Sequence, residues 1–345
     1  RGGAGAPSPR KLKWVPSAWE QAGFDIGNQK GSIFMSVQCK EIQYGVYGRC
    51  LEMSNELCRL VVTLDKGPHI ICYQLHGEPN VMHEDREDAT TQKGPDFDNY
   101  FYPGAVWHIY GGHRLWLSPE SMPETYYPDN FAVPYTVEGN TVTLTPKEQE
   151  GNHVQLVFRI TLEENGTKAT IAHTIYNRDT APKTFAPWGL SVLAPGGVEI
   201  VPQADKPTGL LSNRFLALWP YTDMSDPRVF WGNKYITLTQ RADMDTNFKL
   251  GLNHEKQWSS YLLGRELFIK RFHTVEGGNY PDGGCSFETY TCKNFLEMES
   301  LGELATVAPG ESVDHVEHWE LRTVEEGFDP RDEYSVNNFA KKYIW

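Results

Sequence analysis

Alternation of apolar and polar residues with a period of two is the feature that most restricts the fold of this chain. It runs through residues 156–162 and resumes over 169–175, on the other side of Asn165-Gly166. Asn-Gly between two alternating runs is typical of a β-hairpin turn. The following Thr167 also completes a glycosylation acceptor, but the turn is the favoured interpretation of Asn165-Gly166. We therefore expect an antiparallel hairpin here.

The same alternation recurs along the chain. It predicts further strands at residues 57–64, 69–75, 135–137, 141–145, 236–240, 267–272, 294–300 and 313–321. Long helical periodicity is missing, and only Val336–Tyr343 has the pattern of a short helix. This points to an all-β fold, a large antiparallel sandwich.

The ends of the chain differ from its middle. Gly, Pro, Ser and basic residues dominate the first thirteen positions, without a period. We expect an N-terminal tail over residues 1–30, one β-sandwich domain over 31–323 and a C-terminal extension over 324–345. The chain opens with Arg1 rather than Met, so we expect a truncated or processed N-terminus. No signal peptide is visible, and the localisation stays open.

Composition excludes several classes of partner. The net charge of −13 disfavours nucleic acid, which requires a basic face. No apolar run approaches the ~18–20 residues of a membrane span, so we expect a soluble chain. The 6 cysteines are too few for a disulfide framework in 345 residues, and none forms a CxxC pair, which favours free thiols.

Three segments resemble the galactose mutarotase-like superfamily, which includes aldose 1-epimerases and hexose-6-phosphate 1-epimerases. They are residues 60–75 with Pro79-Asn80, residues 111–120 (Gly-Gly-His-Arg-Leu-Trp-Leu-Ser-Pro-Glu), and residues 295–302 followed by the turn at 308–312. The second is similar to the glycine-rich substrate loop of a branch with a Gly-Gly-His-Arg-Leu-Trp motif. The resemblance covers residues 31–323. It implies a galactose-mutarotase-like β-supersandwich of large antiparallel sheets with a sugar cleft on a concave face.

The resemblance also implies a catalytic base in the third segment. Glu299 matches the family's base best, with Glu297 a close second. Both glutamates would share one face of a strand, which is equally the pattern of an ordinary solvated strand. Mutarotation needs one group to take the proton of the anomeric hydroxyl and another to protonate the ring oxygen. The two interpretations of these glutamates are evenly balanced.

The second segment supplies the other candidates. His113 would be the acid, Arg114 would bind hydroxyls or an anion, and Trp116 would stack on the sugar. A turn histidine and a structural ion pair are the alternatives for His113 and Arg114. Trp188 falls at another cleft-lining position of the family.

Two further residues complete the candidate set. Lys270 shares a face with apolar residues and could bind a substrate anion, although a strand-edge lysine is the commoner case. The family's second histidine is missing from residues 186–195. Either His113 or His108 has then taken over the acid role, or the reaction has changed, or catalysis has been lost. The spacing of the histidines matches no metal site, and we expect neither a metal nor a cofactor.

The leading functional hypothesis is aldose 1-epimerase-like acid–base chemistry on a small-molecule sugar or glycan. One alternative is a non-catalytic carbohydrate-binding module. Another is a structural subunit of a larger assembly with a vestigial sugar cleft, whose terminal extensions contact protein partners.

Overall fold

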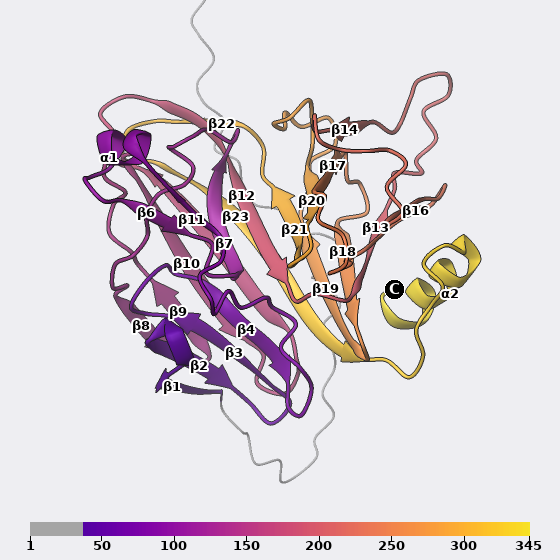
Figure 1. Ribbon diagram of the computed structural model, residues 1–345, viewed down its shortest axis with the longest axis horizontal. Coiled ribbons are helices and arrows are strands. Elements are labelled where there is room, and N and C mark those ends of the chain that lie inside the picture. Colours follow the sequence, from indigo (N-terminus) through magenta and orange to yellow (C-terminus); the bar gives the residue numbers. More distant parts are fainter. Residues whose placement is uncertain (1–36) are drawn as a thin grey trace, which may run out of the picture. The chain divides into compact units, whose positions relative to one another are not determined.

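Two large antiparallel sheets dominate the computed structural model, which describes residues 37–345 (Figure 1). The predicted tail, residues 1–30, lies outside the described residues. In spatial order the first sheet consists of β1 (Gln38–Gln43), β2 (Arg49–Ser54), β3 (Cys58–Thr63), β4 (Ile70–Leu75), β7 (Gly112–Ser118), β12 (Lys183–Leu193), β21 (Leu296–Leu301), β20 (Phe287–Thr291), β17 (Phe248–Leu252) and β14 (Leu216–Leu218), with β22 (Ala305–Val307) paired to one end of β12.

The second sheet covers one face of the first. Its spatial order is β15 (Val229–Trp231), β16 (Tyr235–Thr239), β13 (Val198–Pro202), β18 (Trp258–Leu263), β19 (Glu266–Phe272), β23 (Ser312–Thr323), β11 (Ala169–Asn177), β10 (Val154–Leu162), β9 (Thr141–Leu144) and β8 (Tyr135–Glu138). A two-stranded ribbon consists of β5 (Thr91–Lys93) and β6 (Val106–His108), and α1 (Pro95–Tyr100) lies in the connection between these two strands. A 3₁₀ turn covers Gly45–Tyr47.

Every strand predicted from alternation is present, which confirms the all-β fold. The predicted hairpin is the pair β10–β11, in which Leu162 lies opposite Ala169 across the Asn165-Gly166 turn. The even-numbered residues of β10 are buried and the odd-numbered ones are half-buried or exposed, as the alternation predicts.

The core between the sheets is apolar and aromatic. Tyr73 of the first sheet packs against Phe268 and Trp319 of the second, with ring centroids 6.1 and 5.7 Å apart. Each such fully buried side chain contributes roughly 1.5–3 kcal/mol to folding. This core holds the two sheets face to face and leaves the other face of the first sheet available for a site.

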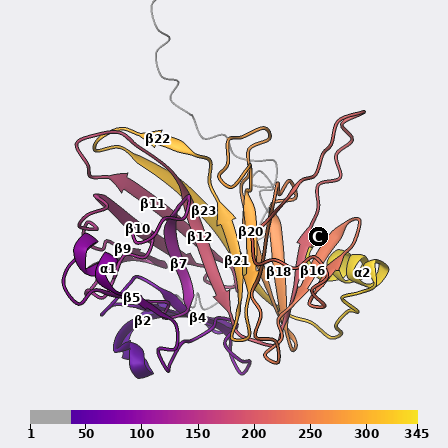
Figure 2. The same ribbon diagram turned by 45° about the horizontal axis from the view of Figure 1, so that its top comes forward.

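The predicted C-terminal helix is α2 (Glu333–Tyr343), and it is longer than the sequence pattern indicated. The side chain of Asp332 caps it by accepting a hydrogen bond from Tyr334 N at 3.0 Å. Phe339 belongs to an apolar cluster with Trp258 and Ile269 on the outer face of the second sheet. Figure 2 shows α2 beside β16, on the side of the second sheet away from the first.

The segment with the Gly-Gly-His-Arg-Leu-Trp motif, expected as a loop, is strand β7. It pairs with β12 from Gly112 to Ser118. Its glycines are needed for close backbone approach. A Cβ at Gly112, whose φ is +62°, would lie 2.1 Å from the main-chain oxygen of Ile70. Because side chains alternate along a strand, His113 and Arg114 face opposite sides of the sheet.

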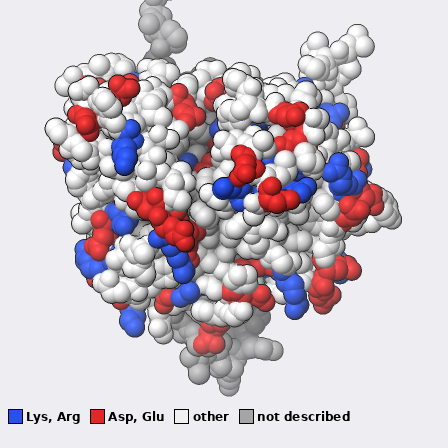
Figure 3. Space-filling view, viewed as in Figure 1, with Lys and Arg blue, Asp and Glu red and all other residues white. Residues whose placement is uncertain are grey.

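Surface charge bears on nucleic acid as a partner, and helix length bears on a membrane. Figure 3 shows the face of the molecule seen in Figure 1, where acidic and basic side chains are interspersed over the described residues without a broad basic patch. Neither helix within residues 37–345 is long and apolar enough to cross a membrane.

Candidate functional site

The outer face of the first sheet, the one turned away from the second sheet, carries a row of charged side chains. Leu190 of β12 lies opposite Arg114 of β7 on one side and Glu299 of β21 on the other. Glu299 in turn lies opposite Glu288 of β20. Strands distant in sequence thus bring three charged groups into line, because residues paired in register project to the same face.

A second row runs beside the first. Glu297 of β21 lies opposite Tyr290 of β20, and Tyr290 lies opposite Lys249 of β17. The long side chain of Lys249 reaches the first row, where its ammonium lies between two carboxylates. Its Nζ is 2.8 Å from Glu288 Oε2 and 3.0 Å from Glu299 Oε2.

These three groups, the Lys249–Glu288–Glu299 cluster, are almost wholly removed from solvent. Their side chains are 6%, 1% and 0% exposed, respectively. Trp188 Nε1 donates a further hydrogen bond to Glu299 Oε2 at 2.9 Å. Oε1 of each glutamate has no hydrogen-bond partner among residues 37–345. Buried polar atoms normally find partners, so the Oε1 of Glu288, the one of the two glutamates that lines a cavity, is a place where a ligand group can bind.

Burial sets the protonation of the cluster. It raises the pKa of both Glu288 and Glu299, and the nearby Lys249 reduces that shift without cancelling it. Neighbouring carboxylates add to the increase, Glu299 for Glu288 and Glu297 for Glu299. The two carboxylates also raise the pKa of Lys249, although burial alone would lower it. One ammonium therefore faces two carboxyls that retain protons more readily than ordinary glutamates.

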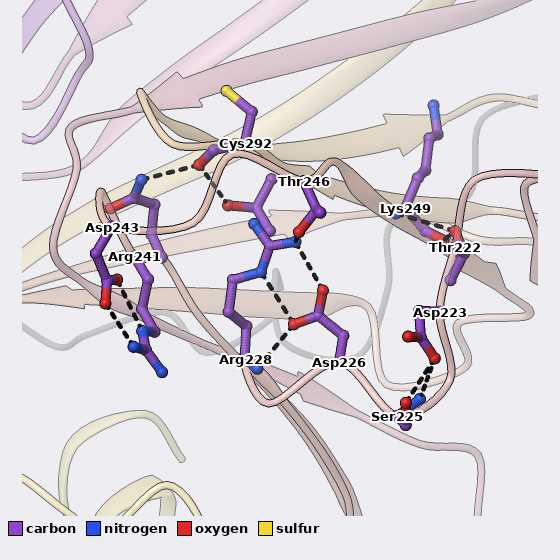
Figure 4. Close-up of polar contacts among 12 residues, drawn as sticks. Thr222, Asp223, Ser225, Asp226, Arg228, Arg241, Asp243, Thr246, Lys249 and Cys292 are labelled. Atoms are coloured by element: carbon purple, nitrogen blue, oxygen red, sulfur yellow. Dashed lines mark hydrogen bonds and ion pairs between the residues drawn. The ribbon is translucent and has the colours of Figure 1, made fainter.

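Aromatic rings surround the ammonium. Lys249 Nζ is 4.8 Å from the ring centroid of Trp188 and 4.6 Å from that of Trp219, distances typical of cation–π contacts. Thr222 anchors the loop that carries Trp219, because its Oγ1 donates to Lys249 O at 2.5 Å and accepts from Lys249 N at 3.2 Å (Figure 4). The buried pair of Arg228 with Asp226, at 2.7 Å, holds the same loop (Figure 4).

A second buried ion pair adjoins the cluster. Arg114 Nη1 lies 3.0 Å from Glu297 Oε1, and both side chains are nearly inaccessible. The guanidinium also stacks on Trp116, with its central carbon 4.1 Å from the ring centroid. Trp116 packs edge-on against Trp188 at 5.6 Å. The Arg114–Glu297 pair is therefore fixed next to the Lys249 cluster.

A cavity of about 350 Å³ opens beside the cluster. That volume lies within the range of roughly 300–1,000 Å³ typical of small-molecule sites. Its wall combines aromatic, apolar and charged side chains: Pro119, Glu120, Met122, Tyr126, Trp188, Trp219, Lys249, Asp282 and Glu288. A cavity with aromatic walls and converging polar groups can hold a sugar, whose C–H faces are apolar and whose hydroxyls need hydrogen bonds.

The sequence matches no protein-family model and no curated protein. Among solved structures, a galactose mutarotase-like protein from Clostridium acetobutylicum superimposes with a TM-score of 0.52 at 10% identity, covering 84% of this chain and 99% of that one. The chain has the galactose mutarotase-like fold. A Synechocystis protein matches with a TM-score of 0.53 at 11% identity, over 86% of this chain and 100% of that one.

A longer solved structure also matches in fold. A TPR-domain-containing protein from Parabacteroides distasonis matches with a TM-score of 0.55 at 14% identity. The match covers 81% of this chain but only 48% of that protein. At these identities the likeness concerns the fold, and the site must be judged on this chain's own residues.

Within this fold, five of the eight residues selected from the sequence lie together on the outer face of the first sheet. They are Arg114, Trp116, Trp188, Glu297 and Glu299. Of these only Trp188 lines the cavity, since Glu299 lies behind Lys249 and is fully buried. The spatial proximity of the 111–116 segment and the two glutamates, which the resemblance implied, is present in the Arg114–Glu297 pair.

His113 and Lys270 lie instead between the sheets. His113 is 0% exposed, and its ring nitrogens contact Ser191 Oγ and His173 Nε2, both at 2.9 Å. Lys270 Nζ lies 2.9 Å from Glu317 Oε1 and also donates to carbonyl oxygens of β12 and β21. This lysine joins the second sheet to the first. Its ammonium is already paired with an anion, the carboxylate of Glu317, rather than with a substrate anion.

His108 lies on the ribbon strand β6, apart from the cavity wall. Its Nδ1 contacts Asp88 Oδ1 at 2.5 Å, and its ring stacks on Tyr110 with centroids 5.1 Å apart. Within residues 37–345 no group of three His, Cys, Asp or Glu side chains could hold a metal ion.

Sequence reasoning missed Glu288. A signal was present in the sequence, because residues 287–291 have the composition and the spacing of side chains typical of a β-strand. The alternation places Glu288 and Tyr290 on one face but does not reveal which strand lies beside them. The bridging position of Lys249 likewise depends on the order β21–β20–β17.

Proposed function

We propose that this chain is a carbohydrate-active enzyme with aldose 1-epimerase-like chemistry at the anomeric centre of a sugar. The observation that carries the proposal is the Lys249–Glu288–Glu299 cluster, of which Lys249 and Glu288 line a sugar-sized cavity. The galactose mutarotase-like fold supports the choice of sugars as substrates, as does the description of the Clostridium acetobutylicum neighbour as a galactose mutarotase-like protein.

Glu288 acts as the acid in this proposal. Burial and the charge of Glu299 raise its pKa, so it holds a proton near neutral pH. It lines the cavity and its Oε1 has no partner among residues 37–345, which leaves that oxygen for the ring oxygen of a sugar. The ammonium of Lys249, at 2.8 Å, then stabilises the carboxylate that remains after proton transfer.

A second carboxylate acts as the base. Glu120 and Asp282 both line the cavity and are exposed, so one of them takes the proton of the C1 hydroxyl. The C1–O5 bond breaks as C1=O1 forms, and O5 receives the proton of Glu288. Rotation about C1–C2 and reversal of the same steps give the other anomer. Every proton is returned to its donor, and the reaction needs no cofactor.

The other outer-face residues position this machinery. Glu299 supplies the charge that keeps Glu288 protonated, and Trp188 holds Glu299 by a hydrogen bond. Trp188 and Trp219 offer ring faces to the apolar side of a sugar. Arg114, Glu297 and Trp116 pack behind Trp188 and fix its orientation.

Polarimetry of freshly dissolved α-glucose and α-galactose tests the proposal. The wild type should accelerate mutarotation, and Glu288→Gln should lose about 100-fold of that rate, the scale of one acid–base group. Glu164→Gln, in the exposed turn between β10 and β11, is the matched control and should keep the full rate. A circular dichroism spectrum unchanged in Glu288→Gln separates lost chemistry from lost folding. Full activity in a folded Glu288→Gln would refute the role of Glu288.

The pH profile supplies an independent test. The rate should fall as the pH rises through the pKa of Glu288, because the acid then loses its proton. Glu299→Gln removes a neighbouring negative charge and should lower that pKa. The alkaline limb of the profile should therefore move to lower pH in Glu299→Gln. An unmoved limb would contradict the positioning role of Glu299.

A second candidate, sugar binding without turnover, is favoured by one observation: no histidine lines the cavity among the described residues. A binding module would leave the mutarotation rate of every sugar unchanged but show saturable binding by calorimetry, which Trp219→Ala would weaken. A chain with neither activity nor binding would fit the structural-subunit hypothesis instead.

A further inference from the structure

The charge of the cavity wall restricts which sugars can enter. Three acidic side chains, Glu120, Asp282 and Glu288, line it against one basic side chain, Lys249. No other Lys or Arg of residues 37–345 lines this cavity. An incoming charged group therefore meets an excess of carboxyl groups.

The lysine is not free to offset this excess. The ammonium of Lys249 donates a hydrogen bond to Glu299 and forms an ion pair with Glu288 at 2.8 Å. Arg114, on the same face of the sheet, is paired with Glu297 at 3.0 Å and stacked on Trp116. Neither cation can bind a phosphate or a sugar carboxylate without giving up a buried partner, and a buried carboxylate left unpaired is costly.

The acids nearest to solvent are placed to attract a cation. Glu120 and Asp282 are both exposed, and Glu120 accepts a hydrogen bond from the hydroxyl of Tyr126 on the cavity wall. The phenol ring of Tyr126 and the ring of Trp219 line the same space. Carboxylates beside aromatic faces are the usual surroundings of a bound ammonium group.

A further observation indicates that a ligand belongs at this wall. Glu288 is 0% exposed, lines the cavity, and has an Oε1 without a hydrogen-bond partner among residues 37–345. A buried oxygen of this kind requires a hydrogen-bond partner from outside the protein. A sugar hydroxyl can both accept the proton of Glu288 and donate to its carboxylate, so it fits this oxygen in either protonation state.

We infer that the cavity selects sugars by charge, binding hexoses that carry a protonated amino group more tightly than neutral hexoses and rejecting phosphorylated sugars and uronic acids. This inference rests on the proposed function, because it concerns the same cavity. It deepens that function by naming the substrate class.

Calorimetric titration at pH 6 with four ligands tests the inference: glucosamine, glucose, glucose 6-phosphate and glucuronic acid. Glucosamine and glucose differ by one group, so their ratio isolates the charge. Glucosamine should bind about tenfold more tightly than glucose, and the two anions about tenfold more weakly, on the scale of one charge pair near a protein surface. Added NaCl should reduce these ratios.

Variants assign the effect to the cavity. The double variant Glu120→Gln with Asp282→Asn should bring the ratio of glucosamine to glucose affinity towards one. Glu164→Gln removes the same kind of charge from an exposed turn outside the cavity and should leave the ratio unchanged. An unchanged ratio in the double variant would overturn the inference.

The outcomes separate this inference from the proposed function. If neutral hexoses are epimerised but glucose 6-phosphate binds as tightly as glucosamine, charge selection is refuted and the proposed function stands. If glucosamine binds with the expected advantage and no sugar is epimerised, charge selection stands and catalysis fails. If no sugar binds or reacts, both are refuted.

Discussion

Replacing the buried His254 should make the protein more resistant to acid than the wild type. The side chain of His254 is 1% exposed and packs edge-on against Phe272 and Phe287, with ring centroids 5.2 and 5.3 Å away. Its Nδ1 accepts a hydrogen bond from Gln257 N, and its Nε2 has no partner among residues 37–345. Burial lowers the pKa of His254 to about 3, and hydrogen bonds offset only part of that shift.

The sign and size of the effect follow from this depressed pKa. An unfolded histidine titrates near 6.5, so at pH 5 the unfolded chain binds a proton that folded His254 does not. That proton stabilises the unfolded state by about 2 kcal/mol, from 1.5 pH units at 1.36 kcal/mol each. The contribution is nearly absent at pH 7.5, where both states are neutral. Stability from neutral His254 is thus present at high pH and is lost as the pH falls from 6.5 towards 3.

Urea denaturation of the wild type and His254→Gln at pH 7.5 and pH 5 measures this contribution. The variant costs some stability at both pH values, because it loses packing against the two phenylalanines. The difference in free energy of unfolding between the two proteins should shift by about 2 kcal/mol in favour of the variant at pH 5. Taking a difference cancels the other titrating groups, including the buried glutamates, whose raised pKa values act in the opposite direction.

Two further variants complete the design. His76→Gln removes an exposed histidine and serves as the matched control. His254→Met preserves apolar packing and serves as a replacement if the glutamine variant folds poorly. A wild-type-minus-variant difference that stays constant between pH 7.5 and pH 5 would show that His254 is not held neutral.

Three further predictions concern stability and are measured by chemical or thermal denaturation. Gly112→Ala should cost at least about 3 kcal/mol through overlap with the backbone of β4, whereas Gly77→Ala, also at positive φ but with open space around it, should cost only about 1–2 kcal/mol. Lys270→Met should cost about 3–5 kcal/mol because it leaves Glu317 buried without its ammonium, and adding Glu317→Gln should restore part of the loss. Asp332→Ala should cost about 1 kcal/mol by removing the cap of α2, and equal stability would contradict that cap.

The strands of this fold could be predicted because burial on one side imposes a period of two. The hairpin β10–β11 is the clearest case, since a turn signal and two alternating runs agree. The β7 segment was misjudged because its two glycines suggested a loop. They instead permit close contact with β4 and His83, a requirement that only the folded backbone reveals.

The site could be predicted only in part, for the same reason. Alternation places Glu297 and Glu299 on one face and separates His113 from Arg114 once β7 is known to be a strand. The pairing of strands distant in sequence could not be predicted. The contacts of Lys249 with Glu288 and Glu299 depend on which strands are neighbours, and local pattern carries no information about that.

The order of strands around the cavity affects how this protein is made. The strands β7, β12, β21, β20 and β17 are adjacent in the sheet but dispersed along the chain from Gly112 to Leu301. A nascent polypeptide therefore cannot assemble this part of the sheet until all residues up to Leu301 have left the ribosome. Folding must close several long loops before these contacts form, which slows the process and exposes unpaired strands in the meantime. Synthesis of this protein should consequently benefit from chaperones that shield such intermediates.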